Sequence, residues 1–382
     1  MRPENLTEKT SQHTSAQNDR FGDQQNRNEH HNHINSSSKS NNNSPKLHPM
    51  MAVQIKPSPV GILILCISFV ILIYYMFRST DVSTTSSISI RELISASIDV
   101  AERGGREVVA VKKEHEEHQK SKGETKEGAN DPVTDGDFRS HVKITSALRK
   151  TFPYLNLVSE EHDQGDLDLT KVQSPNLHIQ EVTDHTNFDE IVPVEELTVW
   201  VDPLDATQEY TENLLHYVTV MVCIARKGVP IAGVIHKPFE QKSYWAYAGS
   251  GLSPILIKQE PKDASKKNVI VSRSHAGSVK EIVQSRLENT DVIPAGGAGY
   301  KVLSLFEGVA NAYVHTTLIK KWDICAGNAL LSAMGGKMTT LKGEQINYDY
   351  KDSARNEGGL LASLSGKDHE QFLTALQGAM DS

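Results

Sequence analysis

A stretch near the middle of the chain, Trp200–Glu212, places two carboxylates at the end of an apolar β-branched run. The run predicts a strand, and we expect Pro203 to end it because proline cannot donate to a strand ladder. Asp202 and Asp205, with the Leu204 carbonyl between them, would then face one point at the end of the strand. Oxygen ligands at this density suit Mg²⁺. An acidic turn between two strands is the alternative interpretation.

Other polar positions would complete such a site. Thr207 lies within reach of the pair and offers a hydroxyl that could hold a metal-bound water. Glu160 follows another short apolar run, and its neighbour Glu161 could compete with it as a ligand. Asp137 and Asp323 each stand where a helix is predicted to begin. Taken singly, these two aspartates have the alternative role of helix N-caps, and Glu160 that of a solvated loop residue.

Composition limits the class of protein. With 382 residues and 42.2 kDa, the chain is long enough for a large core and two lobes. The net charge of −8 argues against nucleic acid as a partner. Of the three cysteines, Cys66 lies in an apolar run, whereas Cys223 and Cys325 lie inside apolar patterns and are expected to be free buried thiols. Cysteine usage therefore does not settle the redox compartment.

The N-terminal region predicts a tail and a membrane anchor. Residues 1–58 are rich in Asn, Ser, Gln and His and are expected to be disordered. Eighteen uncharged residues follow, from Val60 to Phe77, and as a helix they would span about 27 Å, near the lower limit for crossing a bilayer. A cleaved signal peptide fits poorly because the run begins far from the N-terminus. We therefore expect a transmembrane signal anchor at residues 59–78.

The orientation of this anchor is not decided by charge, because few lysines or arginines lie on either side of it. Glycosylation sequons at Asn5, Asn35 and Asn42 all precede the span, so their modification would report which side is lumenal. A short span suits the thinner membranes of the early secretory pathway.

Residues 79–382 are expected to form the folded domain, with one lobe at about 86–263 and a second at about 268–382. Residues 163–195 are polar without a clear period and predict a surface insertion. Two apolar runs joined by a turn at residues 227–228 predict paired strands. Alternating strand and helix patterns follow the lysine-rich segment 255–268, as in α/β units.

Five motifs occur in order along this domain. They are Ser159-Glu-Glu-His162, Asp202-Pro-Leu-Asp-Ala-Thr-Gln-Glu-Tyr210, Ser272-Arg-Ser-His275, Gly296-Gly-Ala-Gly-Tyr-Lys301 and Lys321-Trp-Asp-Ile-Cys-Ala326. Together, over about residues 86–370, they resemble the lithium-sensitive, magnesium-dependent phosphomonoesterases of the inositol monophosphatase superfamily. Within it the chain is most similar to the bisphosphate nucleotidase branch. It departs from the inositol monophosphatases at Leu204, where they commonly carry isoleucine, and at Ala206, where they usually carry glycine.

The resemblance implies a fold and a set of roles. The implied fold is α/β (α+β), a layered αβαβα sandwich of the inositol monophosphatase and fructose-1,6-bisphosphatase type, preceded by one transmembrane helix. Two or three Mg²⁺ ions would be held by Glu160, Asp202, Asp205, Asp323 and the Leu204 carbonyl. Asp137 and Thr207 would orient and deprotonate the attacking water. The substrate contacts would be Ser272, His275, Gly297 and Lys301, for which a capping serine, a surface histidine, a turn glycine and a solvated lysine are the alternatives.

The resemblance also implies an activity. The substrate would be 3′-phosphoadenosine 5′-phosphate, hydrolysed to AMP and phosphate in the Golgi lumen by a single-pass type II protein, which would support glycosaminoglycan sulfation by removing a sulfotransferase by-product. Relatives commonly dimerise, so a homodimer is expected. An inositol phosphate phosphatase and a catalytically silent, membrane-tethered scaffold remain alternatives. A basic-patch membrane adaptor does not fit, since no lysine or arginine cluster flanks the span.

Overall fold

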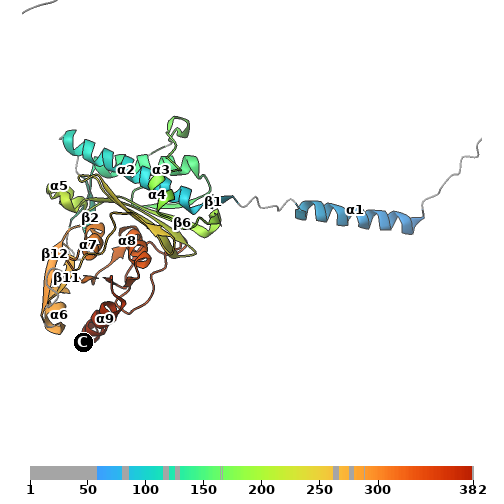
Figure 1. The fold of residues 1–382 in the computed structure, drawn as a ribbon. Helices are drawn as coiled ribbons and strands as arrows, with labels where there is room; N and C mark the ends of the chain where they lie inside the picture. The colour runs from blue at the N-terminus through green and yellow to red at the C-terminus, as the bar shows by residue number, and fades with distance from the viewer. Residues whose placement is uncertain are drawn as a thin grey trace, which may run out of the picture. The chain divides into compact units, whose positions relative to one another are not determined.

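The computed structural model describes residues 58–79, 86–114, 120–124, 130–163, 165, 167–260, 266–274, 279–287 and 289–380 (Figure 1). The chain divides into two compact units, residues 1–79 and 80–382.

The first unit contributes one described helix, α1 (Pro59–Ser79), of 21 residues. Its apolar side chains between Val60 and Tyr74 are mostly exposed to solvent. Among the residues whose side chains are described, which in α1 end at Tyr74, no helix is both long and apolar enough to cross a membrane. The predicted disordered tail and the three sequons lie outside the described residues.

The second unit contains a six-stranded sheet with the order β10-β9-β8-β7-β6-β4. Its strands are β4 (Asn156–Ser159), β6 (Leu197–Asp205), β7 (Thr219–Arg226), β8 (Val229–Lys237), β9 (Lys242–Tyr247) and β10 (Gly251–Leu252). The predicted pair of strands corresponds to β7 and β8, which are antiparallel and joined at Lys227 and Gly228. Only β4 and β6 are parallel within this sheet, so the C-terminal ends of these two strands meet at one edge.

A second sheet of five strands has the order β12-β11-β13-β17-β15. Its strands are β11 (Lys267–Ser272), β12 (Thr290–Ala295), β13 (Ala312–His315), β15 (Lys337–Thr339) and β17 (Leu360–Ser363). The strand β11 lies parallel to both β12 and β13, whereas β17 runs antiparallel to β13 and β15. Short elements complete the unit: β1 (Ser87–Ser89), β2 (Lys120–Glu124), β3 (Asn130–Val133), β5 (Ile191–Pro193), β14 (Ile319–Lys320), β16 (Arg355–Asn356), α4 (Gln180–Asp184) and α5 (Thr207–Thr211).

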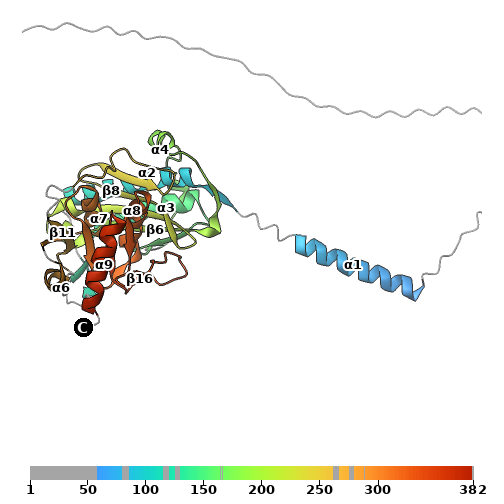
Figure 2. The ribbon, with the colours of Figure 1, turned by 60° about the horizontal axis from the view of Figure 1, so that its bottom comes forward.

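Helices form three layers around the two sheets (Figures 1 and 2). The outer face of the six-stranded sheet is covered by α2 (Ile90–Glu114) and α3 (Asp135–Thr151). The helices α7 (Ala298–Phe306) and α8 (Lys321–Ala333) lie between the sheets, and α6 (Val279–Arg286) and α9 (Gly366–Met380) cover the far face of the second sheet. This is the predicted αβαβα layering.

The strand β7 shows how sequence alternation builds two cores. Val220 and Val222 pack in the core under α2 and α3. Met221 and Cys223 point to the opposite face and join the core that includes α7 and α8. Successive residues of a strand face opposite sides, so an apolar run without polar interruption produces a strand buried on both faces.

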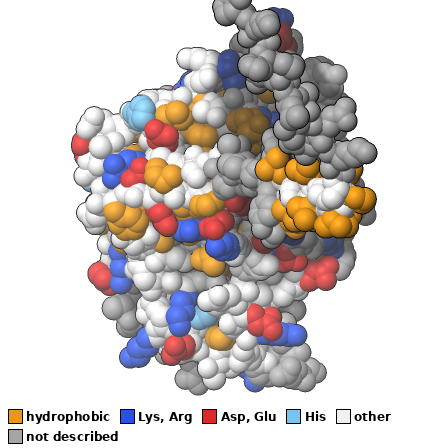
Figure 3. All heavy atoms as spheres, turned by 90° about the vertical axis from the view of Figure 1, so that its right-hand side faces the viewer, with side chains coloured by type: hydrophobic (Ala, Val, Ile, Leu, Met, Phe, Trp, Pro, Cys, Tyr) orange, Lys and Arg blue, Asp and Glu red, His pale blue; other side chains and the backbone are white. Residues whose placement is uncertain are grey.

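The surface view in Figure 3 shows charged side chains of both signs interspersed over one face of the molecule. Among the described residues on this face, neither sign gathers into a large patch.

Two local predictions were wrong. The strand β6 continues through Pro203 to Asp205, because its pairing with β7 shifts register between Asp202 and Asp205 and does not require the missing N–H. Residues 163–195 are more than a surface insertion, since β5 pairs with β1 and Val182 and Val192 are fully buried.

The prediction of free buried thiols was also wrong. Cys223 on β7 and Cys325 on α8 form a disulfide, with Cα atoms 5.7 Å apart and a sequence separation of 102 positions. The sequence could not reveal the pair, because only the packing of α8 against β7 brings the two positions together. Cys66 in α1 is free and exposed.

Candidate functional site

Asp202 lies at the centre of the candidate site, near the end of β6. Its side chain is 2% exposed, and its Oδ1 accepts a hydrogen bond from the Leu204 N–H at 3.1 Å. Burial, together with the negative charges of Glu160, Asp205, Asp323 and Asp137, raises the pKa of Asp202 well above its usual value. The structure therefore gathers these five predicted acidic residues within electrostatic reach of one another.

Asp323 approaches the same site from α8. It is the third residue of the helix, and its Oδ2 accepts a hydrogen bond from the Lys320 N–H at 3.0 Å. Burial raises the pKa of Asp323 well above its usual value, and so do the charges of Glu160 and Asp205. Asp323 is thus not the N-cap itself, which is the position of Lys320.

Asp137 is the third residue of α3, and one of its oxygens serves the helix terminus. The N–H and the hydroxyl of Thr134 both donate to Oδ2, at 2.8 and 2.7 Å. Asp137 belongs to a capping box whose N-cap is Thr134, so the simple N-cap interpretation was wrong by three positions. The other oxygen, Oδ1, lies 3.1 Å from the hydroxyl of Thr207 at the start of α5.

Asp205 joins β6 to the N-terminus of α7. Its Oδ1 accepts from the Ala298 N–H at 2.9 Å, and its Oδ2 accepts from the Gly299 N–H and the Thr219 hydroxyl, each at 2.8 Å. A carboxylate is favourable at a helix N-terminus because it satisfies free amide groups and complements the helix dipole. The following residue, Ala206, adopts a positive φ of 72°, the conformation that glycine adopts at no steric cost.

Glu160 follows β4, where its N–H donates to the Val201 carbonyl at 3.1 Å. The negative charge of Glu160 is among the causes that raise the pKa values of both Asp202 and Asp323, whereas Glu161 acts on His141. This difference favours Glu160 over Glu161 as the residue that faces the site.

Three of the predicted substrate residues, Ser272, Gly297 and Lys301, lie among the described residues. Lys301 is 3% exposed, its Nζ donates to the Gly297 carbonyl at 2.6 Å, and it lies 5.3 Å from the centre of the Tyr313 ring. Burial lowers the pKa of Lys301 to about 8. Ser272 ends β11 and is buried. His275 lies outside the described residues.

The backbone conformation and close packing at position 297 require a glycine. Its φ is +61°, and a Cβ at this position would lie 2.7 Å from the Tyr217 carbonyl oxygen and 2.9 Å from Asp205 Oδ2. The glycine therefore lets the loop before α7 approach the Asp205 carboxylate closely.

Sequence reasoning assigned no role to three residues that support the site. Thr219 holds Asp205. Glu209 is buried and bonds to Arg273 Nη1 at 3.1 Å, and a Cβ on Gly296 would lie 2.4 Å from the Glu209 Cδ. Glu209 and Arg273 stand inside two of the five motifs, which was the available signal.

The donor types at the site, carboxylate and carbonyl oxygens, are those that a hard divalent cation prefers. Among the described residues, no group of three or more His, Cys, Asp or Glu side chains is arranged closely enough to hold a metal ion. The buried carboxylates nevertheless repel one another and raise the pKa values of Asp202 and Asp323. A divalent cation with oxygen ligands would relieve this repulsion, as Mg²⁺ does in carboxylate sites.

Comparison with known proteins identifies a matching family and similar relatives. The inositol monophosphatase family, whose members are generally Mg²⁺-dependent, matches residues 89–381. The chain is 44% identical over 340 residues to inositol monophosphatase 3 of Danio rerio, covering 86% of this chain and 98% of that protein. It is 46% identical over 292 residues to the Golgi-resident adenosine 3′,5′-bisphosphate 3′-phosphatase of Mus musculus, covering 74% and 80%.

Solved structures share the fold. An IMPase from Thermotoga maritima matches with a TM-score of 0.54 and 18% identity, covering 74% of this chain and 96% of that one. The suhB protein of Bartonella henselae matches with a TM-score of 0.54 and 17% identity, covering 75% and 97%. With the family match over most of its length and relatives above 40% identity, the chain belongs to the inositol monophosphatase family.

Proposed function

We propose that this chain is a Mg²⁺-dependent, lithium-sensitive phosphomonoesterase that converts 3′-phosphoadenosine 5′-phosphate to AMP and phosphate. The observation that carries the proposal is the set of acidic residues around Asp202, next to the hydrogen-bonded pair Asp137 and Thr207. A relative 46% identical to this chain is named for the 3′-phosphatase activity on adenosine 3′,5′-bisphosphate, which supports the substrate.

In this mechanism Glu160, Asp202, Asp205, Asp323 and the Leu204 carbonyl would hold two or three Mg²⁺ ions. When bound, Mg²⁺ would neutralise the phosphoryl group and favour in-line displacement. Asp137 would accept the proton of the attacking water, because its Oδ2 is fixed by Thr134 while its Oδ1 lies beside the Thr207 hydroxyl. The water oxygen would form the new bond to phosphorus as the bond from phosphorus to the ribose 3′-oxygen breaks, and the 3′-oxygen would leave as the hydroxyl of AMP by taking a proton from solvent.

The other phosphate of the substrate would be held on the α7 side. Lys301 provides a buried cation, and Gly297 allows close approach of the backbone. Ser272 at the end of β11 would also contact this phosphate, and we propose the same role for His275. An inositol phosphate is the competing substrate, because the 44% identical Danio rerio relative is named inositol monophosphatase 3.

Phosphate release from the full-length, detergent-solubilised chain tests both substrates. We expect rapid release from 3′-phosphoadenosine 5′-phosphate that requires Mg²⁺, falls with Li⁺ and is lost in Asp202→Asn. Faster release from inositol 1-phosphate would overturn the substrate assignment. Absence of release from either substrate by folded protein would instead favour the silent scaffold.

We further propose that the catalytic domain, residues 79–382, lies in the Golgi lumen, anchored through residues 59–78 as a single-pass type II protein. Support comes from the word Golgi-resident in the name of the murine relative, and from the Cys223–Cys325 disulfide, which suits an oxidising compartment. A helix of 21 residues, α1, covers the proposed span. Clearance of the nucleotide there would support glycosaminoglycan sulfation.

Protease treatment of sealed Golgi vesicles tests this topology. We expect the catalytic domain to be protected and the sequons at Asn5, Asn35 and Asn42 to remain unglycosylated. Glycans on these sequons would contradict the type II orientation and indicate the opposite one. Recovery of the chain in the supernatant after an alkaline wash would contradict the proposed membrane anchor. A homodimer, the expected assembly, would be measured by light scattering at several protein concentrations.

A further inference from the structure

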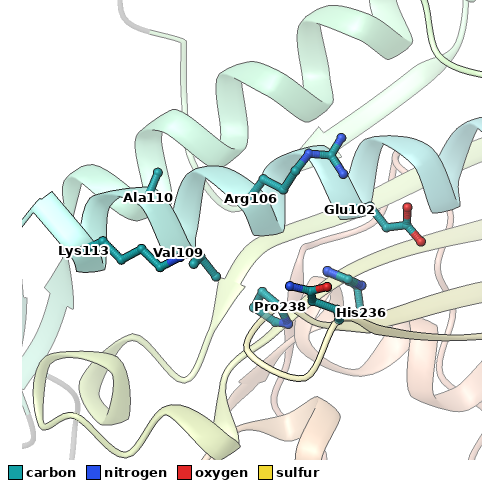
Figure 4. Close-up of a pocket in the computed structure, with 8 residues that line it drawn as sticks. Glu102, Arg106, Val109, Ala110, Lys113, His236 and Pro238 are labelled. Atoms are coloured by element: carbon teal, nitrogen blue, oxygen red, sulfur yellow. The ribbon is translucent and has the colours of Figure 1, made fainter. Parts of the chain in front are cut away.

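A pocket lies apart from the candidate catalytic residues. It has a volume of about 500 Å³, within the range of about 300–1,000 Å³ typical of small-molecule sites. Its lining residues are Glu102, Arg106, Val109, Ala110 and Lys113 on α2, and His236, Pro238 and Gln241 at the end of β8 and the turn that follows (Figure 4). None of them belongs to the acidic site around Asp202.

A buried tyrosine, Tyr210, packs against the same helix and the same turn that line the pocket. Tyr210 on α5 has no exposed surface, and its hydroxyl donates to the Val108 carbonyl of α2 at 3.0 Å. Its ring lies 6.5 Å from that of Phe239, which follows Pro238 of the pocket. The pocket lining includes neither Tyr210 nor Thr207, so a ligand there would contact α2 and the β8–β9 turn.

The pocket contains two cations without acidic partners. Arg106 and Lys113 are exposed, and among the described residues neither makes an ion pair or a side-chain hydrogen bond. The neighbouring acids of the same helix have other partners. Glu107 is paired with Arg139 at 2.7 Å and Lys143 at 3.3 Å, and Glu114 is paired with Arg139 at 2.8 Å. Glu102, which itself lines the pocket, accepts a hydrogen bond from the Ser243 hydroxyl at 2.8 Å. The two cations are seven residues apart on α2, about 10.5 Å along the helix, and they bracket Val109 and Ala110.

Two residues of the pocket lining, Glu102 and His236, are linked through the hydroxyl of Ser243. The Ser243 hydroxyl donates its only proton to Glu102 Oε1 at 2.8 Å and lies 2.9 Å from His236 Nδ1. The proton between Ser243 and His236 must therefore belong to Nδ1, which leaves Nε2 as an acceptor in a neutral ring. Burial supports this neutral state, because it lowers the pKa of His236 to about 4.

A glycine makes room for this imidazole. A Cβ on Gly105 would lie 2.6 Å from His236 Cδ2 and 2.8 Å from Nε2. The helix can approach the ring only because Gly105 has no side chain, and the ring then forms part of the pocket wall.

We propose that this pocket is a binding site for a small organic phosphate or sulfate ester. Arg106 and Lys113 hold the anionic head, Val109, Ala110 and Pro238 contact the apolar body, and His236 Nε2 accepts from a ligand N–H or O–H. Arginine and lysine together suit such an anion, since the guanidinium matches its oxygen pairs and the ammonium adds a point charge. The proposal does not depend on the activity proposed for the acidic site.

The test measures binding to the full-length chain in detergent with EDTA, so that no turnover occurs. The probes are adenosine 5′-phosphate as a phosphate ester and N-acetylglucosamine 6-sulfate as a sulfate ester, at low salt. Amide hydrogen exchange locates the bound probe. We expect protection of residues 102–113 and 236–241 by at least one probe, and the probe that protects identifies the ester class.

Charge variants distinguish specific binding in the pocket from nonspecific electrostatic attraction of the anionic probe to the protein surface. Arg106→Gln with Lys113→Gln should weaken the binding measured by this protection at least tenfold. The matched control, Lys342→Gln with Lys367→Gln, removes two exposed cations elsewhere and should leave it within twofold. A third variant, Ala110→Trp, fills the pocket without changing charge and should also abolish protection, with its melting temperature confirming that it folds. Equal weakening in the control pair, or absence of protection by both probes, would overturn the proposal.

Discussion

The hydroxyl of Thr207 lies 3.1 Å from Asp137 Oδ1 and 3.0 Å from the Leu204 carbonyl oxygen. One hydroxyl proton can serve only one of these acceptors at a time, so the oxygen of Thr207 keeps lone pairs for a third partner. The contact also joins two segments 70 residues apart, the start of α3 and the start of α5. It places the proposed base beside the end of β6, which carries Asp202 and Asp205.

Removing this hydroxyl is expected to slow catalysis with little effect on stability. We predict that Thr207→Val lowers kcat by about 10²–10⁴-fold, the usual contribution of positioned proton transfer, with a small change in KM. Thr207→Ser should recover most of the rate. The matched control is Thr211→Val, which removes a hydroxyl bonded to the Gln208 carbonyl on the same helix. A Thr207→Val enzyme as fast as the Thr211→Val enzyme would contradict the role of Thr207.

Gly297 provides a test of close packing behind the site. We predict that Gly297→Ala lowers kcat/KM at least tenfold, because the new Cβ would press on the Tyr217 carbonyl and on Asp205 Oδ2. Gly335→Ala is the matched control, since Gly335 has a φ of +79° and no atom within 4 Å of its ideal Cβ position. Both variants carry backbone strain of about 1–3 kcal/mol, measured by denaturant unfolding. Equal activity in the two variants would show that the contact with Asp205 is unimportant.

The disulfide is expected to stabilise the domain. Cross-links that close loops of about 100 residues contribute up to about 4.7 kcal/mol in the chain-entropy model, and typically about 2–4 kcal/mol. We predict that Cys223→Ala with Cys325→Ala lowers the free energy of unfolding by about this typical amount. Cys66→Ala should have no effect, because this thiol is free and exposed. The prediction fails if a reductant leaves the unfolding midpoint of the natural protein unchanged.

Much of the site could be read from the sequence because its residues lie at the ends of recognisable elements. An apolar run ending in Asp-Pro-Leu-Asp located Asp202 and Asp205, and the parallel pairing of β4 with β6 brings Glu160 to the same edge. Thr207 follows directly on α5. Local pattern and chain direction were sufficient in these cases.

What the sequence did not reveal depends on contacts between distant segments. The hydrogen bonds that the N–H groups of Ala298 and Gly299 donate to the Asp205 carboxylate join positions more than 90 residues apart. The Cys223–Cys325 bond needs α8 packed on β7, and the path of β6 through Pro203 depends on a register shift. Each feature is fixed by tertiary packing, which overrides local preference.

The lowered pKa of Lys301 predicts how substrate affinity depends on pH. Burial lowers this pKa to about 8, so the ammonium loses its proton as pH rises through that value. A phosphate group binds the protonated form, and KM should therefore be nearly constant below pH 7 and stand about tenfold above that plateau at pH 9. Lys301→Met should raise KM at neutral pH and remove this rise, whereas Lys367→Met, which changes an exposed lysine elsewhere, should leave the profile unchanged.

The measurement is KM for 3′-phosphoadenosine 5′-phosphate at fixed ionic strength from pH 6.5 to 9.5. A rise that persists in Lys301→Met would assign the titration to another group, and the buried ammonium would then serve only to hold the Gly297 carbonyl, to which it donates at 2.6 Å.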